Sequence, residues 1–202
     1  MGVLLSVTCM AKTVGKQFEA DFAASIPEDV YFQRIKDPAQ SFGGSGNTSF
    51  SPSNPYDCYM YSYPTFFALE LKTADKAMSF WRENSEGDPL KHTYNIKRNQ
   101  IEALQKASKH KGVIAGFVLN FRSEDKTYFL EINKFLDLVN SIDKKSINKM
   151  DVSSCGLLIH QKKLRVHYRY DIGRFIKEVA QKQGGEEHCL TSMRLSPALA
   201  TQ

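Results

Sequence analysis

A nearly continuous apolar run, Val113 to Phe121, constrains the fold more than any other segment of the chain. It reads VIAGFVLNF and lies between Gly112 and Arg122. A strand that is buried on both faces has this composition, whereas a strand with one solvated face alternates apolar and polar residues. We therefore expect a central sheet with other elements packed on both of its faces.

The remaining periodic segments predict helices and strands in alternation. In the first of them, Val14, Phe18, Phe22 and Ile26 recur every fourth residue, which is the spacing of one helix face. By composition and period we expect helices over residues 12–26, 95–109, 133–140 and 171–181, and strands over residues 30–35, 56–61, 65–72, 127–132 and 164–168. This order favours an α/β domain with helices flanking the sheet.

Several segments lack such a period. Residues 36–55 are rich in Gly, Ser, Asn and Pro, and we expect a long flexible excursion directly ahead of Asp57. Residues 74–94 are polar and predict an irregular or partly helical insertion. We expect one domain over residues 10–183, with flexible tails at residues 1–9 and 184–202.

The segment from Asn54 to Thr73 carries the candidate chemistry. Asp57 is followed thirteen residues later by Glu70 and then, after one more residue, by Lys72. In the alternating strand, Glu70 and Lys72 share one face. Because the preceding strand forms a hairpin with this one, we expect both acids at one end of it.

Two neighbouring carboxylates repel each other unless a cation lies between them. Mg²⁺ is bound by one or two carboxylates, with water and substrate phosphate as the other ligands. A lysine beside it can orient water or offset charge on a phosphodiester. The pattern therefore favours a metal-dependent nuclease, although E-x-K alone more often marks two solvated residues on a strand.

Composition narrows the function classes. The chain has 202 residues, a net charge of +5 and a pI near 8.9, which favours a polyanionic partner without requiring one. Its four cysteines and five histidines are scattered, so neither a zinc site nor a disulfide scaffold is indicated. The apolar run at residues 3–9 is too short for a membrane span, and we expect a cytoplasmic protein.

With these motifs in order, the chain resembles the PD-(D/E)XK nuclease superfamily and, within it, the RecU-type Holliday junction resolvases of low-GC Gram-positive bacteria and their phages. The resemblance rests on a helix bearing Glu19, the excursion, Pro55-x-Asp57, Glu70-x-Lys72 and a helix that opens with Asn99-Gln100-Ile101-Glu102. It extends over the segments YFLE at 128–131, KKSI at 144–147 and RVHY at 165–168.

The resemblance implies a restriction-endonuclease-like core, in which a mixed central sheet is flanked by helices and a flexible stalk projects at about residues 36–55. It implies a homodimer that resolves four-way DNA junctions by paired symmetric nicks, with Mg²⁺ as cofactor and Mn²⁺ able to replace it. Asp57, Glu70 and Gln100 would bind the metal, Lys72 would stabilise the transition state, and Glu19 would be a further acid of the site. The residues that would contact DNA phosphates are Lys97, Arg98, Lys109, Lys111, Lys144 and Lys145.

Two departures from the family pattern bear on these roles. Pro55 stands where the family usually has threonine, so only its carbonyl could reach a metal, and the interval between Lys72 and Gln100 is longer than usual. Three alternatives stay open: a related nuclease acting on duplex or flap DNA, a DNA-binding recombination factor that does not cleave, and an acidic strand with a structural role only.

Overall fold

The computed structural model describes residues 14–35, 54–82 and 94–193, with side chains up to residue 182. An N-terminal helix covers residues 14–23. The other elements are, in order, β1 (Tyr31–Arg34), β2 (Cys58–Ser62), β3 (Thr65–Ala74), β4 (Ala77–Ser79), α2 (Arg98–Ser108), β5 (Val113–Phe121), the 3₁₀ turn η1 (Arg122–Glu124), β6 (Lys126–Glu131), α3 (Ile132–Ser141), β7 (Ser146–Asn148), α4 (Lys149–Ser153), β8 (Leu157–Ile159), β9 (Gln161–Lys163), β10 (Tyr168–Tyr170) and α5 (Ile172–Met193).

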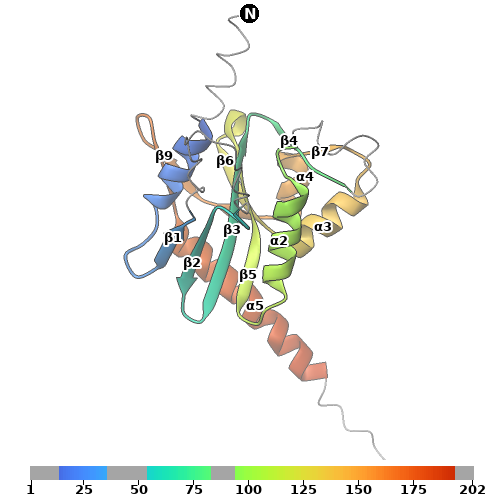
Figure 1. The fold of residues 1–202 in the computed structure, drawn as a ribbon. Helices are drawn as coiled ribbons and strands as arrows, with labels where there is room; N and C mark the ends of the chain where they lie inside the picture. Colours follow the sequence, from blue (N-terminus) through green and yellow to red (C-terminus); the bar gives the residue numbers. More distant parts are fainter. Residues whose placement is uncertain (1–13, 36–53, 83–93, 194–202) are drawn as a thin grey trace, which may run out of the picture.

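The centre of the molecule is a six-stranded sheet in the order β1-β2-β3-β5-β6-β8 (Figure 1). β3 and β5 pair in parallel, and every other pair in this sheet is antiparallel. The predicted α/β architecture with a mixed central sheet is therefore confirmed. β5 has the bounds expected from its apolar run, and it lies inside the sheet with strands on both sides.

Helices pack on both faces of this sheet (Figure 1). On one face, Ile101 and Leu104 of α2 and Phe135 of α3 join the buried core. On the other, Phe22 of the N-terminal helix and Phe175 of α5 belong to a second core. Two apolar layers of this kind explain why the residues of β5 are buried regardless of which face they occupy.

The side chains of β3 alternate between the two faces of the sheet, and the candidate site depends on this alternation. Phe67, Leu69 and Leu71 belong to the core beneath the N-terminal helix and α5. Ala68 belongs to the core beneath α2, so Glu70 and Lys72 project on the side of α2. The predicted division of this strand into two faces is confirmed.

Gly116 of β5 gives a stability test of this central sheet. A Cβ atom at this position would lie 2.5 Å from the Leu130 carbonyl oxygen and 2.8 Å from a ring carbon of Phe129. Because backbone and a buried ring leave no room, Gly116→Ala is expected to lower the free energy of unfolding by about 2 kcal/mol. Urea denaturation measures this, with Gly15→Ala as control, because a Cβ at Gly15 meets nothing within 4 Å. Equal stability of both variants would contradict the packing of β5 against β6.

Two predictions about secondary structure were wrong, one about the type of structure in a segment and one about the end of a helix. The segment 74–94 contains a strand, β4, which pairs with β7 far along the chain, whereas we expected an irregular or helical insertion. The last helix, expected over residues 171–181, continues to Met193, into the segment we assigned to a flexible tail.

The C-terminal strand prediction was also wrong. We expected a strand over residues 164–168, but residues 164–167 form the turn of a hairpin between β9 and β10, closed by a 2.7 Å hydrogen bond from the Leu164 N–H to the His167 carbonyl. β8, which pairs with β6, was not foreseen. Both errors concern strands of three residues, which are too short to show a period.

The predicted stalk falls mostly on residues 36–53, outside the described residues. Among the helices of the part described, none combines the length and the apolar character needed to cross a lipid bilayer.

Candidate active site

The β2–β3 hairpin brings Asp57 to β3. Cys58 pairs with Leu69, so Asp57, one residue earlier, lies across from Glu70. The Asp57 carboxylate accepts a 2.8 Å hydrogen bond from the backbone N–H of Leu71, which lies between Glu70 and Lys72. The hairpin register therefore gathers the three predicted residues at one place.

Glu70 and Lys72 are in direct contact. The Lys72 ammonium lies 2.8 Å from a carboxylate oxygen of Glu70. The Glu70 side chain is 2% exposed and that of Lys72 is 20% exposed. The lysine is thus the solvent-accessible member of the pair, placed to meet a ligand that approaches the buried carboxylate.

The electrostatics of Glu70 are unusual for a carboxylate. Burial raises the pKa of Glu70 to about 7, the nearby Lys72 charge acts to lower it, and the charge and hydrogen bonding of Asp57 raise it further. A strongly perturbed acid beside a charged partner is typical of functional sites. Near neutral pH, Glu70 therefore exchanges readily between its charged and neutral forms.

Gln100 is brought to the same place from α2. Its amide nitrogen donates a hydrogen bond to the carboxylate of Glu70. Its amide oxygen accepts a 2.9 Å hydrogen bond from the backbone N–H of Lys97, at the start of the helix. Gln100 thus orients Glu70 in this structure, and its role as a metal ligand stays a prediction.

Glu19 reaches the same region from the N-terminal helix, where it forms an ion pair with Arg34 of β1. The charges near Cys58 show how close these groups lie to the hairpin. Burial raises the pKa of the Cys58 thiol well above the usual value, and the charges of Asp57, Glu70 and Glu19 raise it further. Glu19 therefore stands close enough to act electrostatically on this part of the hairpin.

Arg34 is a residue of this region that sequence reasoning missed. It lies opposite Cys58 in the β1–β2 pairing, and the charge of Arg34 lowers the pKa of the Cys58 thiol. Only the register of β1 against β2 reveals this position, because nothing in the sequence distinguishes Arg34 from other surface arginines.

The six predicted phosphate-binding residues do not form one cluster. Lys97 and Arg98 lie at the Gln100 end of α2, whereas Lys109 and Lys111 follow its other end.

Some of these cations contact other side chains. Arg98 pairs with Glu102 at 2.6 Å and covers the ring of Trp81 at 4.9 Å. Before β7, Lys145 is exposed, while Lys144 is bound to Asp151 at 2.7 Å. Arg98 and Lys144 thus already have acidic partners, and the contact of all six residues with DNA stays a prediction.

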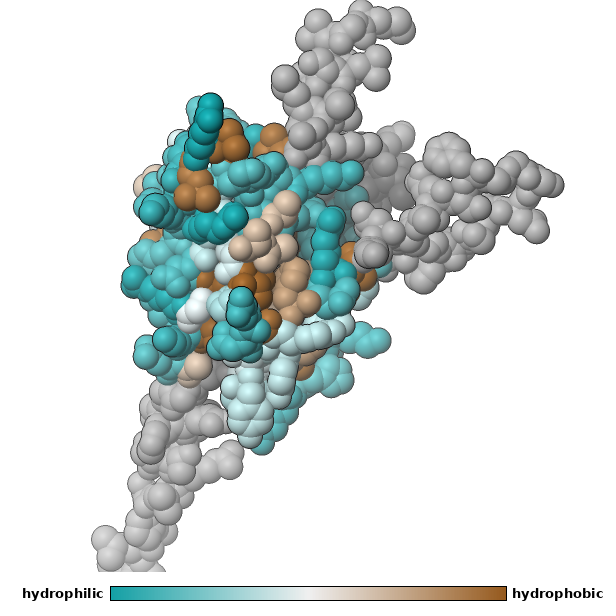
Figure 2. Space-filling view, turned by 90° about the vertical axis from the view of Figure 1, so that its left-hand side faces the viewer, coloured by the Kyte–Doolittle hydropathy of each residue, from teal (hydrophilic) through white to brown (hydrophobic). Residues whose placement is uncertain are grey.

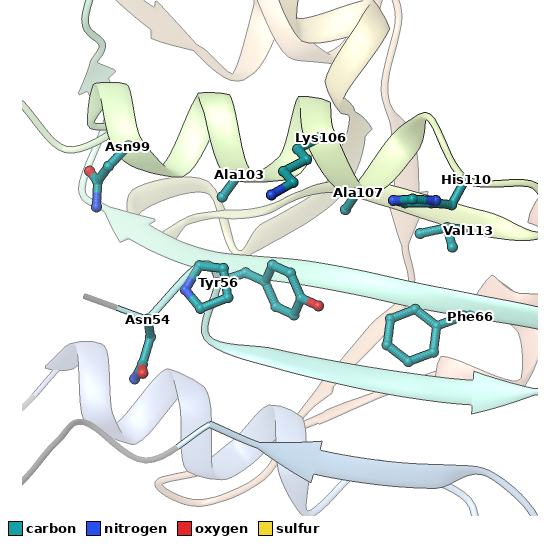
Figure 3. Close-up of a pocket in the computed structure, with 10 residues that line it drawn as sticks. Asn54, Tyr56, Phe66, Asn99, Ala103, Lys106, Ala107, His110 and Val113 are labelled. Atoms are coloured by element: carbon teal, nitrogen blue, oxygen red, sulfur yellow. The ribbon is translucent and has the colours of Figure 1, made fainter. Parts of the chain in front are cut away.

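A groove of roughly 500 Å³ runs along α2 beside the acids (Figure 3). The rings of Tyr56 and Phe66 lie opposite the small side chains of Ala103 and Ala107. The rest of its lining is Asn54, Pro55, Asn99, Lys106, His110 and Val113. Because Tyr56 precedes Asp57 and Asn99 precedes Gln100, the groove adjoins the candidate site. Pro55, noted above as a departure from the family pattern, lines the groove.

The donor set of the site suits a hard cation. In the described part of the chain, no group of three or more His, Cys, Asp or Glu side chains is arranged to hold a metal. Asp57 and Glu70 make a pair of adjacent carboxylates, and their mutual repulsion contributes to the raised pKa of Glu70. Two carboxylates with water and phosphate are a typical Mg²⁺ environment, so the residues fit this ion.

Comparisons with known proteins place the chain in a family. The family described as "Recombination protein U" (RecU) matches residues 74–173. The SPbeta prophage-derived uncharacterized protein YotM of Bacillus subtilis (strain 168) is 30% identical over 188 residues, which cover 86% of this chain and 90% of that protein. The chain belongs to the RecU family. The resemblance noted from the sequence is therefore confirmed.

The family match and the candidate site overlap only in part. The RecU match begins at residue 74, two residues after Lys72, and includes Gln100. The acid pair and the lysine of this RecU protein are therefore supported by their geometry, and the match extends over α2, β5, β6 and the β9–β10 hairpin.

This RecU protein also superposes on a solved structure, that of Hjc, a Holliday junction resolvase from the archaeal hyperthermophile Archaeoglobus fulgidus. The TM-score is 0.44 with 16% sequence identity, and the superposition covers 71% of this chain and 95% of Hjc. At this distance the likeness carries no argument about activity.

Proposed function

We propose that this protein is a Mg²⁺-dependent endonuclease that resolves four-way DNA junctions by paired symmetric nicks, acting as a homodimer, and that Mn²⁺ can replace Mg²⁺. Membership in the RecU family supports a role in recombination. The observation that carries the proposal is the contact of buried Glu70 with Lys72 beside Asp57, next to a groove along α2.

The energetics of Glu70 argue against a purely structural role. A rise of its pKa from 4.5 to about 7 corresponds to on the order of 3 kcal/mol of lost stability when Glu70 is charged. A carboxylate with only a structural role would lower the stability of the fold in this way without any compensating benefit. A bound cation would offset this loss, because the cation replaces the proton between two carboxylates.

Asp57 and Glu70 are the residues that would hold the metal. When bound, Mg²⁺ supplies positive charge beside the phosphodiester and favours the attack of water on phosphorus. Asp57 is held in place by the Leu71 N–H, and Gln100 holds the carboxylate of Glu70 from the side of α2. These hydrogen bonds fix both carboxylates before any ligand arrives, which is the preorganisation that catalysis requires.

Lys72 has a different role. Its ammonium group contacts Glu70 and is partly open to solvent, so it can move between the carboxylate and a phosphate oxygen. There it would offset the negative charge that develops as the phosphodiester is attacked. We assign Glu19 a supporting electrostatic role, since its carboxylate is paired with Arg34.

The homodimer follows from the substrate. A four-way junction has two-fold symmetry, and two symmetric cuts require two equivalent sites related by the same symmetry. Each protomer would contribute one site and make one nick.

A substrate comparison tests the proposal. A four-way junction, a linear duplex, a flap and a single strand of matched sequence are incubated with the protein in Mg²⁺, and products are resolved on denaturing gels. We expect cutting of the junction in two opposite strands and at least 10-fold slower cutting of the others, because recognition of phosphates alone carries no base specificity and must depend on DNA shape.

The same assay separates the alternatives. Equal cutting of duplex or flap DNA would favour a related nuclease with another substrate. Binding of the junction without cleavage in either Mg²⁺ or Mn²⁺ would favour a recombination factor that only binds DNA. Asp57→Asn, prepared in the same way, shows whether the cutting depends on the candidate site.

A further inference from the structure

The β9–β10 hairpin carries an exposed cationic surface that lies outside the candidate active site. Lys162, Lys163, Arg165 and Arg169 are all exposed over this short segment. One exposed carboxylate, that of Asp125, contacts it, 3.4 Å from the Lys163 ammonium and hydrogen-bonded to the hydroxyl of Tyr168. The hairpin therefore presents an excess of positive charge to solvent.

The hairpin is held rigidly, although two-stranded hairpins are marginally stable by themselves. Asp21 of the N-terminal helix is 3% exposed and accepts a 2.9 Å hydrogen bond from the Tyr168 N–H. Its other carboxylate oxygen lies 2.7 Å from Nδ1 of His167. At the base of the hairpin, the Thr127 hydroxyl donates a 2.5 Å hydrogen bond to the side chain of Gln161. A buried carboxylate thus fixes the turn in one position.

The tip of the hairpin is apolar. The side chain of Val166 is 72% exposed and that of Leu164 is 39% exposed, and both lie between the cationic residues in the sequence. On the face shown in Figure 2, brown apolar side chains likewise lie among teal hydrophilic ones near the upper edge. A tip of this kind, with cations around an apolar side chain, matches DNA in which charged phosphates border the apolar faces of unstacked bases.

The hairpin is connected to the region of the candidate site through the N-terminal helix. Asp21 follows Glu19 by two residues, which places their side chains on opposite sides of the same helix. Glu19 contacts Arg34 on one side, while Asp21 contacts the hairpin on the other. The N-terminal helix therefore links the hairpin to the Glu19–Arg34 pair.

We propose that the β9–β10 hairpin is a second DNA-contact element of the junction-binding surface. Lys162, Arg165 and Arg169 contact phosphates of a junction arm, and Val166 packs against bases that are unstacked at the branch point. This inference rests on the proposed function in one respect only, that the ligand is branched DNA.

Binding measurements test the phosphate contacts without relying on cleavage. The triple variant Lys162→Ala/Arg165→Ala/Arg169→Ala is titrated with a labelled four-way junction in Ca²⁺ at several salt concentrations. We expect roughly 10-fold weaker binding and a salt dependence whose slope is smaller by about 2–3, because up to three phosphate contacts are lost. The control Lys134→Ala/Lys177→Ala/Lys182→Ala removes the same charge from α3 and α5 and is expected to bind much more like the unmodified protein.

Wild-type affinity and salt slope in the hairpin variant would overturn the proposal and would indicate a partner other than DNA. Equal weakening in the control would overturn it too, because the effect would then reflect net charge alone. A protein that binds the junction but does not cut it would defeat the proposed function while this binding test still stands.

Val166→Ser tests the apolar tip. The ratio of junction affinity to duplex affinity is expected to fall several-fold, and an unchanged ratio would refute the contact with bases. Thermal melting of each variant checks the fold.

Discussion

Replacing Lys72 by methionine is expected to slow junction cleavage by about 10²–10³-fold while junction binding stays within a few-fold of the unmodified protein. The lysine contacts Glu70 at 2.8 Å and is the accessible cation of the site, so its loss removes charge stabilisation from the transition state. Methionine keeps the length of the side chain. Because the pKa of Glu70 is already about 7, the carboxyl can take up a proton when its partner is removed, and the variant is expected to fold.

Single-turnover cleavage in Mg²⁺ measures the rate, and titration in Ca²⁺ measures binding. Lys76→Met is the matched control, since Lys76 is an exposed lysine just beyond β3 and outside the site. A Lys72→Met enzyme that cuts at the unmodified rate would remove Lys72 from the chemistry. If instead binding and rate fell together, the lysine would serve affinity alone.

Replacing Glu70 by glutamine is expected to stabilise the metal-free protein at pH 8 and to have much less effect at pH 5. The folded protein holds the Glu70 proton more tightly than the unfolded chain, because burial raises the pKa from 4.5 to about 7. The free energy of unfolding therefore falls as pH rises through this window, and the loss is complete above about pH 7. Glutamine carries no charge at any pH, so the difference grows to on the order of 3 kcal/mol, or roughly 5–10 °C in Tm.

Thermal melting with EDTA at pH 5 and pH 8 measures this difference, and Glu102→Gln is the control, because it removes a carboxylate that is 54% exposed. Addition of Mg²⁺ at pH 8 is expected to raise the Tm of the unmodified protein and of Glu102→Gln, but not that of Glu70→Gln. An equal response of all three proteins to Mg²⁺ would place the metal elsewhere. A pH-independent effect of Glu70→Gln would mean that Glu70 titrates as an ordinary exposed acid.

The sequence alone was sufficient to predict those features that a local pattern of residues determines. β5 has the predicted bounds because a strand buried on both faces must be apolar throughout. Glu70 and Lys72 could be placed on one face of β3 from the period of two alone. Asp57 could be brought near them because a hairpin joins strands that are neighbours in the chain.

The sequence was insufficient where the deciding contacts are distant. The Arg165–Tyr168 segment alternates as a strand does, but its turn is fixed by Asp21, almost 150 residues away. The pairing of β4 with β7 is of the same kind. Within the site, the family resemblance brought Gln100 together with Glu70 but could not reveal that its amide nitrogen faces the carboxylate while its oxygen caps α2.

Mapping the cleavage products of a four-way junction shows whether Asp57, Glu70 and Lys72 form a metal-dependent cleavage centre. Each of the four strands is labelled in turn and incubated with the protein in Mg²⁺, with the protein in EDTA, and with Asp57→Asn in Mg²⁺. We expect two nicks at symmetric positions in opposite strands in the first reaction and none in the other two. Unchanged nicking by Asp57→Asn, or in EDTA, would contradict this expectation.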